Sequence, residues 1–406
     1  MVTLGVGSPK KDRVLIVGAG PVGLVAALRL ARAGIAVTVL EKAEALHSEP
    51  RASTFHAPTL ELLDTLGLTA RLHELGRPSP LWQYRIYETG EAAIFDYGLI
   101  ADQTRYPYRL QCEQFNLVTL AAAALEKEAP GSLIFGADVS EVSQTTNNVS
   151  ATFIRDDKTE IITGAWLIAA DGATSAIRTK LGVGFKGETY PAVSFTVGTP
   201  FAFHEHMPAM LGVNYFWSDF GPFSMFHTRF MWRVGWSPPP DSLDEDTLSD
   251  GIVQAKLAKI CPAGAPFSLM TARLYRVHKR VAETFNIGRI LLAGDAAHLN
   301  SPAGGFGMNG GVQDVFNLTT KLIAIAEGAP AEALFDRYTR QRRSAAIDDI
   351  HSTSDANYRR HRESDPAKRR EALRDMQAII ADPDKHRAFL MDNALINSYR
   401  RSEAVA

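Results

Sequence analysis

Short apolar runs that end at glycine alternate with stretches of helical periodicity near the start of the chain. Val14 to Val17 is a run of four aliphatic residues that stops at Gly18, a pattern typical of a buried parallel strand. From Pro21 to Ala33 the apolar positions recur at helical spacing, and Gly34 follows as a stop signal. A second strand is expected from Ile35 to Leu40, which completes a strand–helix–strand unit.

Two later apolar runs predict further strands of the same sheet. They are Trp166 to Ala170 and Arg289 to Ala293, and each ends in a turn of glycine and aspartate. Between them, from Tyr190 to about Val277, the sequence is rich in aromatic residues, Val and Thr, which is typical of an antiparallel sheet. From Asp336 onward the chain has helical propensity and many arginines. We therefore expect an α/β fold with an inserted, mostly antiparallel sheet and C-terminal helices.

Within the aromatic stretch, Met225 to Trp236 can be read with a period of two residues, as one strand. One face is then almost wholly apolar, and the opposite face carries His227, Arg229 and Arg233. The apolar face needs a core behind it, whereas the polar face meets either solvent or a functional cavity. If the polar face covers a cavity, Arg229 and His227 are the side chains that we expect to act on a substrate.

Composition narrows the class of protein without indicating a substrate. The chain has 406 residues, 46% hydrophobic and 22% charged, with a formal net charge of −2, so no global field favours nucleic acid or an anionic membrane. Its two cysteines are too far apart for a CxxC thiol–disulfide relay. Met1 to Arg13 lacks the apolar core of a signal peptide and is expected to be a disordered tail. A cytoplasmic protein without an integral membrane segment or a metal site is the resulting expectation.

The turn after the first strand, GAGPVG, matches the GxGxxG pattern of dinucleotide-binding folds. Gly18 permits the tight turn, Gly20 lets the backbone approach a pyrophosphate, and Gly23 allows close packing of helix and strand. The helix N-terminus offers free N–H groups to the phosphates. Glu41, at the end of the second strand, is expected to accept hydrogen bonds from ribose hydroxyls. A purely structural glycine turn is the alternative, which this context of strand, helix and acid disfavours.

Two later motifs separate FAD from NAD as the expected cofactor. A DG motif lies within Ala169 to Arg178, and a GD motif lies within Gly294 to His298. With the glycine turn, these motifs resemble the flavoprotein aromatic hydroxylases, the family of p-hydroxybenzoate hydroxylase, over roughly Val14 to Arg343. The resemblance implies a Rossmann-like FAD-binding fold of the glutathione-reductase type. The expected units are a FAD-binding domain at 14–185 and 278–345, a substrate domain at 186–277 and a helical region at 346–406.

The resemblance also assigns roles to residues around the flavin. Asp295 is expected to bind hydroxyls of the ribityl chain, while Asp171 and Arg178 are expected near the pyrophosphate and the transient nicotinamide partner. Arg51, in the loop after the second strand, and Gln114, on a helix, are further expected cofactor contacts. For these last two, a surface salt bridge and a helix-surface amide stay open as alternatives.

The segment from Pro302 to Gly311 resembles the family's loop that opens a helix beside the flavin ring. It contains a second GxGxxG match, but no strand directly precedes it, so we expect no second nucleotide fold. A helix N-terminus at this place stabilises the negative charge of reduced flavin. The expected residues are Pro302 at the catalytic position and Gly305, Gly307, Met308 and Asn309 as cofactor contacts. We interpret His298, Asp314 and Asn317 as structural residues.

The activity implied by the resemblance is FAD-dependent monooxygenation of an aromatic ring, phenol-like or heteroaromatic. NADH or NADPH reduces the flavin, O2 adds at C4a, and the hydroperoxide transfers oxygen to the ring. The expected partners are O2, the nicotinamide and a small aromatic substrate, and a homodimer stays open. An epoxidase or an isoprenoid-type reductase on the same fold is the alternative, whereas the Trp-x-Trp-x-Ile-Pro segment of flavin halogenases is missing. A non-catalytic flavin- or ligand-binding protein is disfavoured by Asp295 and the Pro302 loop.

Overall fold

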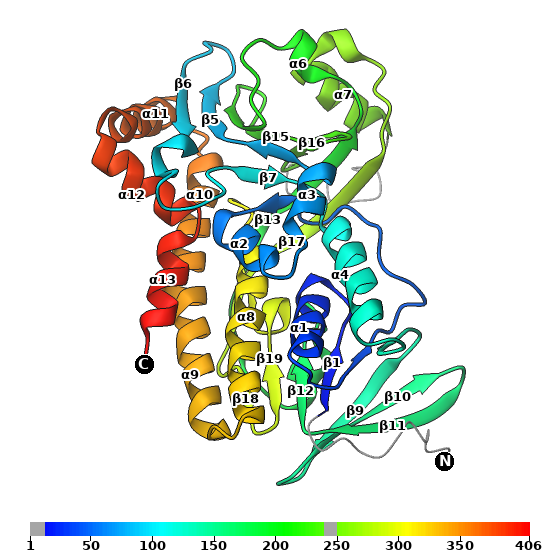
Figure 1. Cartoon of the computed structure of the whole chain (residues 1–406). Helices are drawn as coiled ribbons and strands as arrows, with labels where there is room; N and C mark the ends of the chain where they lie inside the picture. The colour runs from blue at the N-terminus through cyan, green and yellow to red at the C-terminus, as the bar shows by residue number, and fades with distance from the viewer. Residues whose placement is uncertain (1–12, 239–249) are drawn as a thin grey trace.

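The first predicted strand forms β1 (Val14–Val17), which lies inside a six-stranded sheet with the order β18-β19-β12-β1-β2-β8. The structure is a computed structural model, which describes residues 13–238 and 250–406 (Figure 1). β1 pairs in parallel with β2 (Val37–Leu40) and β12 (Trp166–Ala169), and β12 pairs in parallel with β19 (Ile290–Leu292). The predicted parallel strands are therefore confirmed, while most of the predicted tail lies outside the described residues.

Three helices pack around the six-stranded sheet: α1 (Pro21–Arg32), α4 (Gln114–Glu128) and α8 (Gly307–Ala326). α1 contacts both of the others, and its apolar side chains Leu24 and Leu28 are fully buried, as their helical spacing predicts. The edges of the sheet are β8 (Leu133–Ile134) and the antiparallel β18 (Asn286–Ile287). Smaller helices of this part of the chain are α2 (Ala57–Asp64), α3 (Thr69–Leu75) and α5 (Ala176–Lys180).

A second sheet of eight strands, with the order β20-β17-β13-β16-β15-β14-β5-β6, forms the upper part of the molecule in Figure 1. Its strands are β5 (Leu81–Ile86), β6 (Ala92–Asp96), β13 (Phe185–Thr199), β14 (Val213–Trp217), β15 (Phe223–His227), β16 (Trp232–Trp236), β17 (Thr271–Ala282) and β20 (His298–Leu299). Only β14 and β5 pair in parallel. The sheet is mostly antiparallel, as predicted, but β5 and β6 come from before residue 185.

Each face of the eight-stranded sheet has its own apolar core. One core contains Met225, Trp232 and Val234 and includes residues of α6 (Phe203–His206) and α7 (Asp250–Ile260). The other contains Tyr84 and Tyr215 and includes residues of α11 (Pro366–Ala381) and α12 (Pro383–Asn393). Because both faces are covered, the face on which a residue lies decides which part of the molecule it can reach.

The reading of Met225 to Trp236 as one strand is wrong. The segment is a hairpin, in which β15 and β16 are joined by a turn where the backbone N–H of Thr228 donates to Met231 O at 3.0 Å. His227 pairs with Trp232 and Phe226 pairs with Arg233, and paired residues lie on the same face of a sheet. The turn therefore puts His227 and Arg233 on opposite faces, although simple alternation put them on one.

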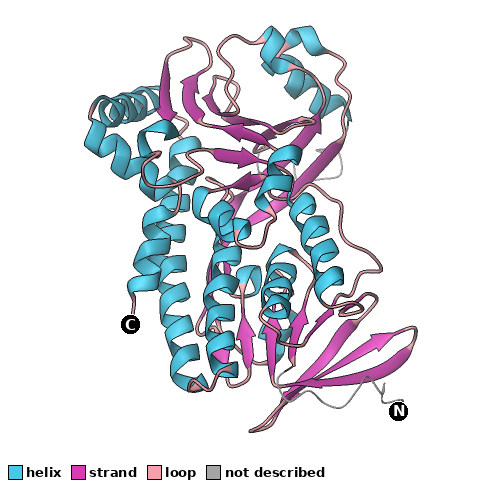
Figure 2. Cartoon of the chain, viewed as in Figure 1, coloured by secondary structure: helices cyan, strands magenta, loops and turns pink. Residues whose placement is uncertain are grey.

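The C-terminal residues are helical, as predicted. α9 (Ala331–Ser344) continues through a π-helical segment (Ala345–His351) into α10 (Ser352–His361), and α13 (Ile396–Ala404) contacts both α9 and the π-helical segment. Two small sheets complete the fold (Figure 2). They consist of β3 (Thr54–Phe55), β4 (Arg77–Ser79) and β7 (Arg109–Gln111), and of β9 (Asp138–Gln144), β10 (Val149–Arg155) and β11 (Lys158–Gly164). Within the described ranges, none of the helices could cross a membrane.

Candidate functional site

Four of the predicted motifs meet at the carboxyl edge of the six-stranded sheet. Gly18 follows β1, Glu41 follows β2, Asp171 follows β12, and Asp295 follows β19. β1 lies between β2 and β12 in this sheet: the chain runs from β1 through β2 to β8 on one side, and then returns to β12 and β19 on the other side. Such a switch point is where open α/β sheets bind ligands, and the motifs are thus placed for one shared site.

The glycine turn has the shape of a phosphate cradle. Gly18 has a φ of +102°, and a Cβ atom there would lie 2.4 Å from Ala170 O. A Cβ atom on Gly23 would lie 2.0 Å from Gly18 O, so only glycine permits this close approach of helix and strand. Gly20 has open space where its side chain would be, and no side chain caps α1 at this end. The first N–H groups of α1 thus remain available to a pyrophosphate.

Glu41 lies directly beside this turn and is almost fully buried. Its Oε2 accepts a hydrogen bond from the backbone N–H of Ala19 at 2.7 Å, and its Oε1 accepts one from Ala43 at 3.0 Å. Each carboxylate oxygen can accept more than one hydrogen bond. The two backbone bonds therefore fix the carboxylate while leaving acceptor capacity for ribose hydroxyls.

Arg178 holds the DG and GD turns together. Its guanidinium donates to Ala296 O at 2.9 Å and to Ala173 O at 3.1 Å, and it stacks 3.7 Å from the centre of the Phe185 ring. Asp171 accepts a hydrogen bond from the backbone N–H of Ile177 at 3.2 Å, while its Oδ1 is buried without a partner in the protein. The unpartnered oxygen marks Asp171, more than Arg178, as free to bind a ligand.

The GD turn rests on a buried ion cluster centred on Asp314. Its carboxylate accepts hydrogen bonds from the backbone N–H of Gly294 at 3.0 Å, from His298 Nε2 at 2.8 Å and from Arg342 Nε at 2.7 Å. Burial alone would raise the pKa of Asp314, but His298 and Arg342 outweigh it and lower this pKa to about 2. His298 and Asp314 thus have structural roles in the turn, and Asn317 hydrogen-bonds Gln341.

Asp295 points out from this turn and is exposed at the edge of the sheet. Desolvation by the surrounding protein raises the pKa of its carboxyl group, while the charges of His298 and Arg51 lower it by less. Arg51 itself is exposed, and its Nη2 lies 3.8 Å from Glu49. Both side chains are therefore near each other and accessible to a cofactor.

The N-terminus of α8 and the loop before it lie against the 54–56 segment. Asn309 donates to Thr54 O and Gly305 O and accepts from the backbone N–H of His56. Its side-chain amide therefore holds the loop against the 54–56 segment. Met308 is buried, whereas Pro302 is exposed and Gly305 and Gly307 are partly exposed. Cofactor contacts from Met308 and Asn309 would therefore come from their backbone N–H groups in the first turn of α8.

Two site candidates on and after β7 were missed by sequence reasoning. Gln111 is fully buried, its Oε1 accepts from Thr54 at 3.1 Å, and its Nε2 has no partner in the protein. Both carboxylate oxygens of buried Glu113 are also unpartnered. Predicted Gln114 begins α4, with its backbone bonded to Ala52 O. A strand of three residues is too short for a periodic signal, so the buried, unpartnered amide of Gln111 could not be predicted from the sequence.

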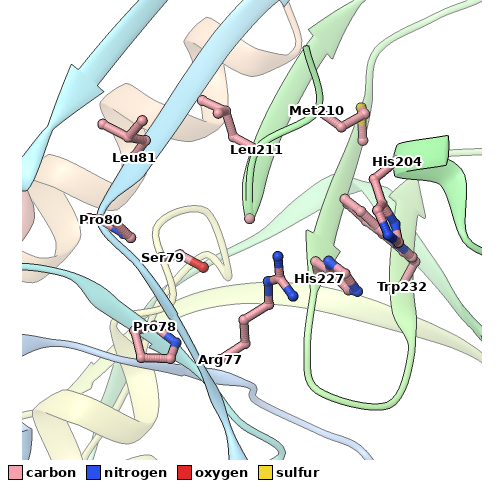
Figure 3. A pocket seen from close by; sticks show the side chains of 11 residues that line it. Arg77, Pro78, Ser79, Pro80, Leu81, His204, Met210, Leu211, His227 and Trp232 are labelled. Carbon is pink, nitrogen blue, oxygen red and sulfur yellow. The ribbon is translucent and has the colours of Figure 1, made fainter. Parts of the chain in front are cut away.

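The structure does not bring Arg229 and His227 to this site. Arg229 is exposed in the β15–β16 turn and donates to Glu74 O. His227 stacks on Trp232 at 4.2 Å and, with Arg77 and His204, lines a cavity of about 220 Å³ (Figure 3). Burial, with Arg77 and His204, lowers the pKa of His227 to about 4. Instead Arg233 reaches the predicted flavin side, where its guanidinium donates to Arg51 O at 2.6 Å.

These features fit FAD. The cradle at Gly20 suits its phosphates, and the carboxylates of Glu41 and Asp295 suit its hydroxyls. The unpartnered amide of Gln111 and the uncapped N-terminus of α8 suit the edge of its ring. Among the described residues, no group of three or more acidic, histidine or cysteine side chains could hold a metal ion.

Comparison with known proteins gives the same assignment. A family model described as "FAD binding domain" matches residues 11–352. The chain is 32% identical to para-nitrophenol 4-monooxygenase of Pseudomonas sp. strain WBC-3, over 96% of this chain and 97% of that one. It is similar in structure to p-nitrophenol 4-monooxygenase of Pseudomonas putida DLL-E4, with a TM-score of 0.88 and 30% identity over 96% of this chain and 98% of that one. It also resembles aklavinone-11 hydroxylase in complex with FAD and aklavinone, with a TM-score of 0.77 and 25% identity over 88% of this chain and 70% of that one.

Proposed function

Because the chain belongs to the family of FAD-dependent aromatic hydroxylases, we propose that it hydroxylates the ring of a small phenol, using O2 and NADH or NADPH. The observation that supports the phenol most is the similarity to two nitrophenol monooxygenases over nearly the full length of both chains. Both of these relatives are named for a phenol with one aromatic ring, which favours a single-ring substrate.

Bound FAD would supply the redox chemistry, by taking up hydride from the nicotinamide and activating O2 for insertion. The chain's own residues would bind and polarise the cofactor. Backbone N–H groups of α1 and the carboxylates of Glu41 and Asp295 would hold the adenosine diphosphate and ribityl parts. The N-terminus of α8 would place a partial positive charge beside the ring, where negative charge develops on reduction.

The cofactor is tested by releasing the chromophore of the purified protein with heat and chromatographing it. FAD is expected, because the glycine cradle and Glu41 are suited to an adenosine diphosphate half. FMN, or no flavin after reconstitution with FAD, would contradict the proposal.

The substrate is tested by following NADH and NADPH oxidation while single-ring phenols are added to the holoenzyme. We expect phenols to stimulate oxidation and their methyl ethers not to. If isolated alkenes stimulate oxidation and phenols do not, an epoxidase or a double-bond reductase on the same fold is the better account.

A further inference from the structure

A cavity of about 220 Å³ lies between β4, the start of β5, α6 and the β15–β16 hairpin (Figure 3). Pockets for drug-sized ligands have volumes of about 300–1,000 Å³, so a cavity of this size suits a molecule with one ring. None of the residues described as lining it is among those assigned to the cofactor. The function proposed above therefore makes no use of this cavity.

The cavity lies on the face of the eight-stranded sheet opposite to Arg233. Trp232 lines it and belongs to the apolar core that includes residues of α6 and α7. Neighbouring residues of a strand point to opposite faces of a sheet, and the guanidinium of Arg233 donates to Arg51 O. A ligand beside Trp232 would thus contact the other face of β16.

Arg77 gives the cavity a positive charge that no carboxylate balances. Its guanidinium points into the space between Ser79 and His227 (Figure 3). Arg71, on the preceding α3, is paired with Glu74, whereas Arg77 is in no ion pair in the part of the chain that the structure describes. No acidic residue is among those described as lining the cavity. An anion is therefore attracted here, and a guanidinium can bind a carboxylate through two parallel hydrogen bonds.

Two buried donors in the cavity wall lack a partner. Ser79 and Trp232 are at most 3% exposed, and the Ser79 hydroxyl and Trp232 Nε1 make no hydrogen bond within the described residues. A Cβ atom on Gly212 would lie 2.1 Å from Ser79 Oγ, so the glycine leaves room for this hydroxyl. Because an unpaired buried donor costs free energy, both groups favour a ligand that accepts hydrogen bonds.

Aromatic and apolar side chains form the rest of the wall. The ring of His227 stacks on that of Trp232 at 4.2 Å, and the ring of His204 lies 5.1 Å from that of His227. Burial, followed by the charges of Arg77 and His204, lowers the pKa of His227 to about 4, so this imidazole is neutral at physiological pH. The remaining side chains are those of proline, leucine and methionine. Such surroundings suit the flat body of an aromatic ring.

We propose that this cavity is a second ligand site, for a carboxylate that carries a single aromatic ring. The carboxylate would accept hydrogen bonds from Arg77, Ser79 and Trp232. The ring would lie among the two histidines and the apolar side chains. The inference goes beyond the proposed function and does not depend on it, since binding here involves none of the residues assigned to the cofactor.

The test measures the binding of radiolabelled benzoate to the oxidised holoenzyme by equilibrium dialysis. Benzyl alcohol, which lacks the charge, and acetate, which lacks the ring, are the competitors. We expect benzoate to bind and both competitors to displace it at least about tenfold less well. A parent protein that binds no benzoate would overturn the proposal. Acetate or inorganic phosphate that competes as well as benzoate would overturn the assignment of an aromatic ligand.

Variants then locate the bound benzoate. Arg77→Gln should weaken benzoate binding by about tenfold, as expected for the loss of a charged hydrogen bond, and Ser79→Ala by about two- to tenfold. Arg71→Gln is the matched control, because Arg71 is a nearby exposed arginine that is paired with Glu74 outside the cavity. FAD content should be the same in all three variants. If Arg77→Gln binds benzoate as tightly as the parent, benzoate binds elsewhere and the proposal is wrong.

Failure of this inference is distinguishable from failure of the proposed function, because dialysis requires no turnover. Phenol-stimulated NAD(P)H oxidation in a protein that binds no benzoate contradicts only the second site. Benzoate binding that depends on Arg77, in a protein that no phenol stimulates, contradicts only the proposed phenol substrate.

Discussion

The charged side chains around the predicted flavin site differ in how their charges are balanced. Asp314 is neutralised by Arg342, so it can support the GD turn without a ligand. Asp295 is exposed, with Arg51 as a nearby opposite charge. The buried pair therefore supports the fold, whereas the exposed carboxylate of Asp295 is accessible to the proposed cofactor.

Asp295→Ala should lower FAD affinity by about one to two orders of magnitude, because charge-assisted hydrogen bonds to ribityl hydroxyls are lost. The measurement is a fluorescence titration of apoprotein with FAD. Asp295→Asn, which keeps an acceptor, should lose less. Unchanged affinity in a folded Asp295→Ala protein would remove this residue from the cofactor site.

Arg233 and Arg229 should behave differently, although both are arginines of one hairpin. Arg233→Ala removes the donor to Arg51 O, so we expect FAD affinity to fall by about tenfold. Arg229→Ala should change the free energy of unfolding by less than about 0.5 kcal/mol and leave flavin reduction unchanged, because the side chain is exposed. Stopped-flow reduction and FAD titration of both variants check this. Slow reduction in Arg229→Ala would restore its predicted catalytic role.

At the scale of elements, α8 joins the flavin loop to the C-terminal helices through Asp314 and Arg342. Such a cluster could not be predicted, because it pairs residues on α8 and α9 that have no local signal. The glycine turn and the first strands could be predicted, since each has a local cause in spacing and turn chemistry. The hairpin at Thr228 could not, because its turn contains neither glycine nor proline, the usual marks of a strand end.

Asp314→Asn should destabilise the protein by about 3–5 kcal/mol, because it leaves Arg342 buried without its charge partner. The pKa of Asp314 is lowered to about 2 in the fold, where His298 and Arg342 outweigh burial. Its contribution to stability is therefore present above the ordinary carboxyl pKa of about 4 and is lost as the pH falls toward 2.

Urea unfolding between pH 7 and pH 3 measures both effects of the Asp314 substitution. Asp348→Asn, at an exposed carboxylate, is the control and should unfold like the parent protein. If Asp314→Asn is as stable as the parent at pH 7, the cluster does not support the GD turn.

At the scale of the whole molecule, the predicted substrate side is built from segments far apart in the sequence. β5 joins β14 in the large sheet, and α11 and α12 cover the same aromatic face. The inserted sheet was predictable from its aromatic and β-branched composition, but its long-range pairing with residues 81–96 was not. β7 pairs with both β3 and β4, and Asn309 of α8 hydrogen-bonds the 54–56 segment, so segments far apart in the sequence meet beside the predicted flavin loop.

The proposed function requires that this assembly transfer oxygen from O2 to a phenol ring. The most direct measurement is mass spectrometry of the product formed by the FAD-loaded enzyme with NADH or NADPH, 4-nitrophenol and ¹⁸O2. We expect a ring-hydroxylated product with one ¹⁸O atom, formed as the nicotinamide is consumed. Nicotinamide oxidation that yields only hydrogen peroxide with every phenol tested, or product oxygen derived from water, would contradict it.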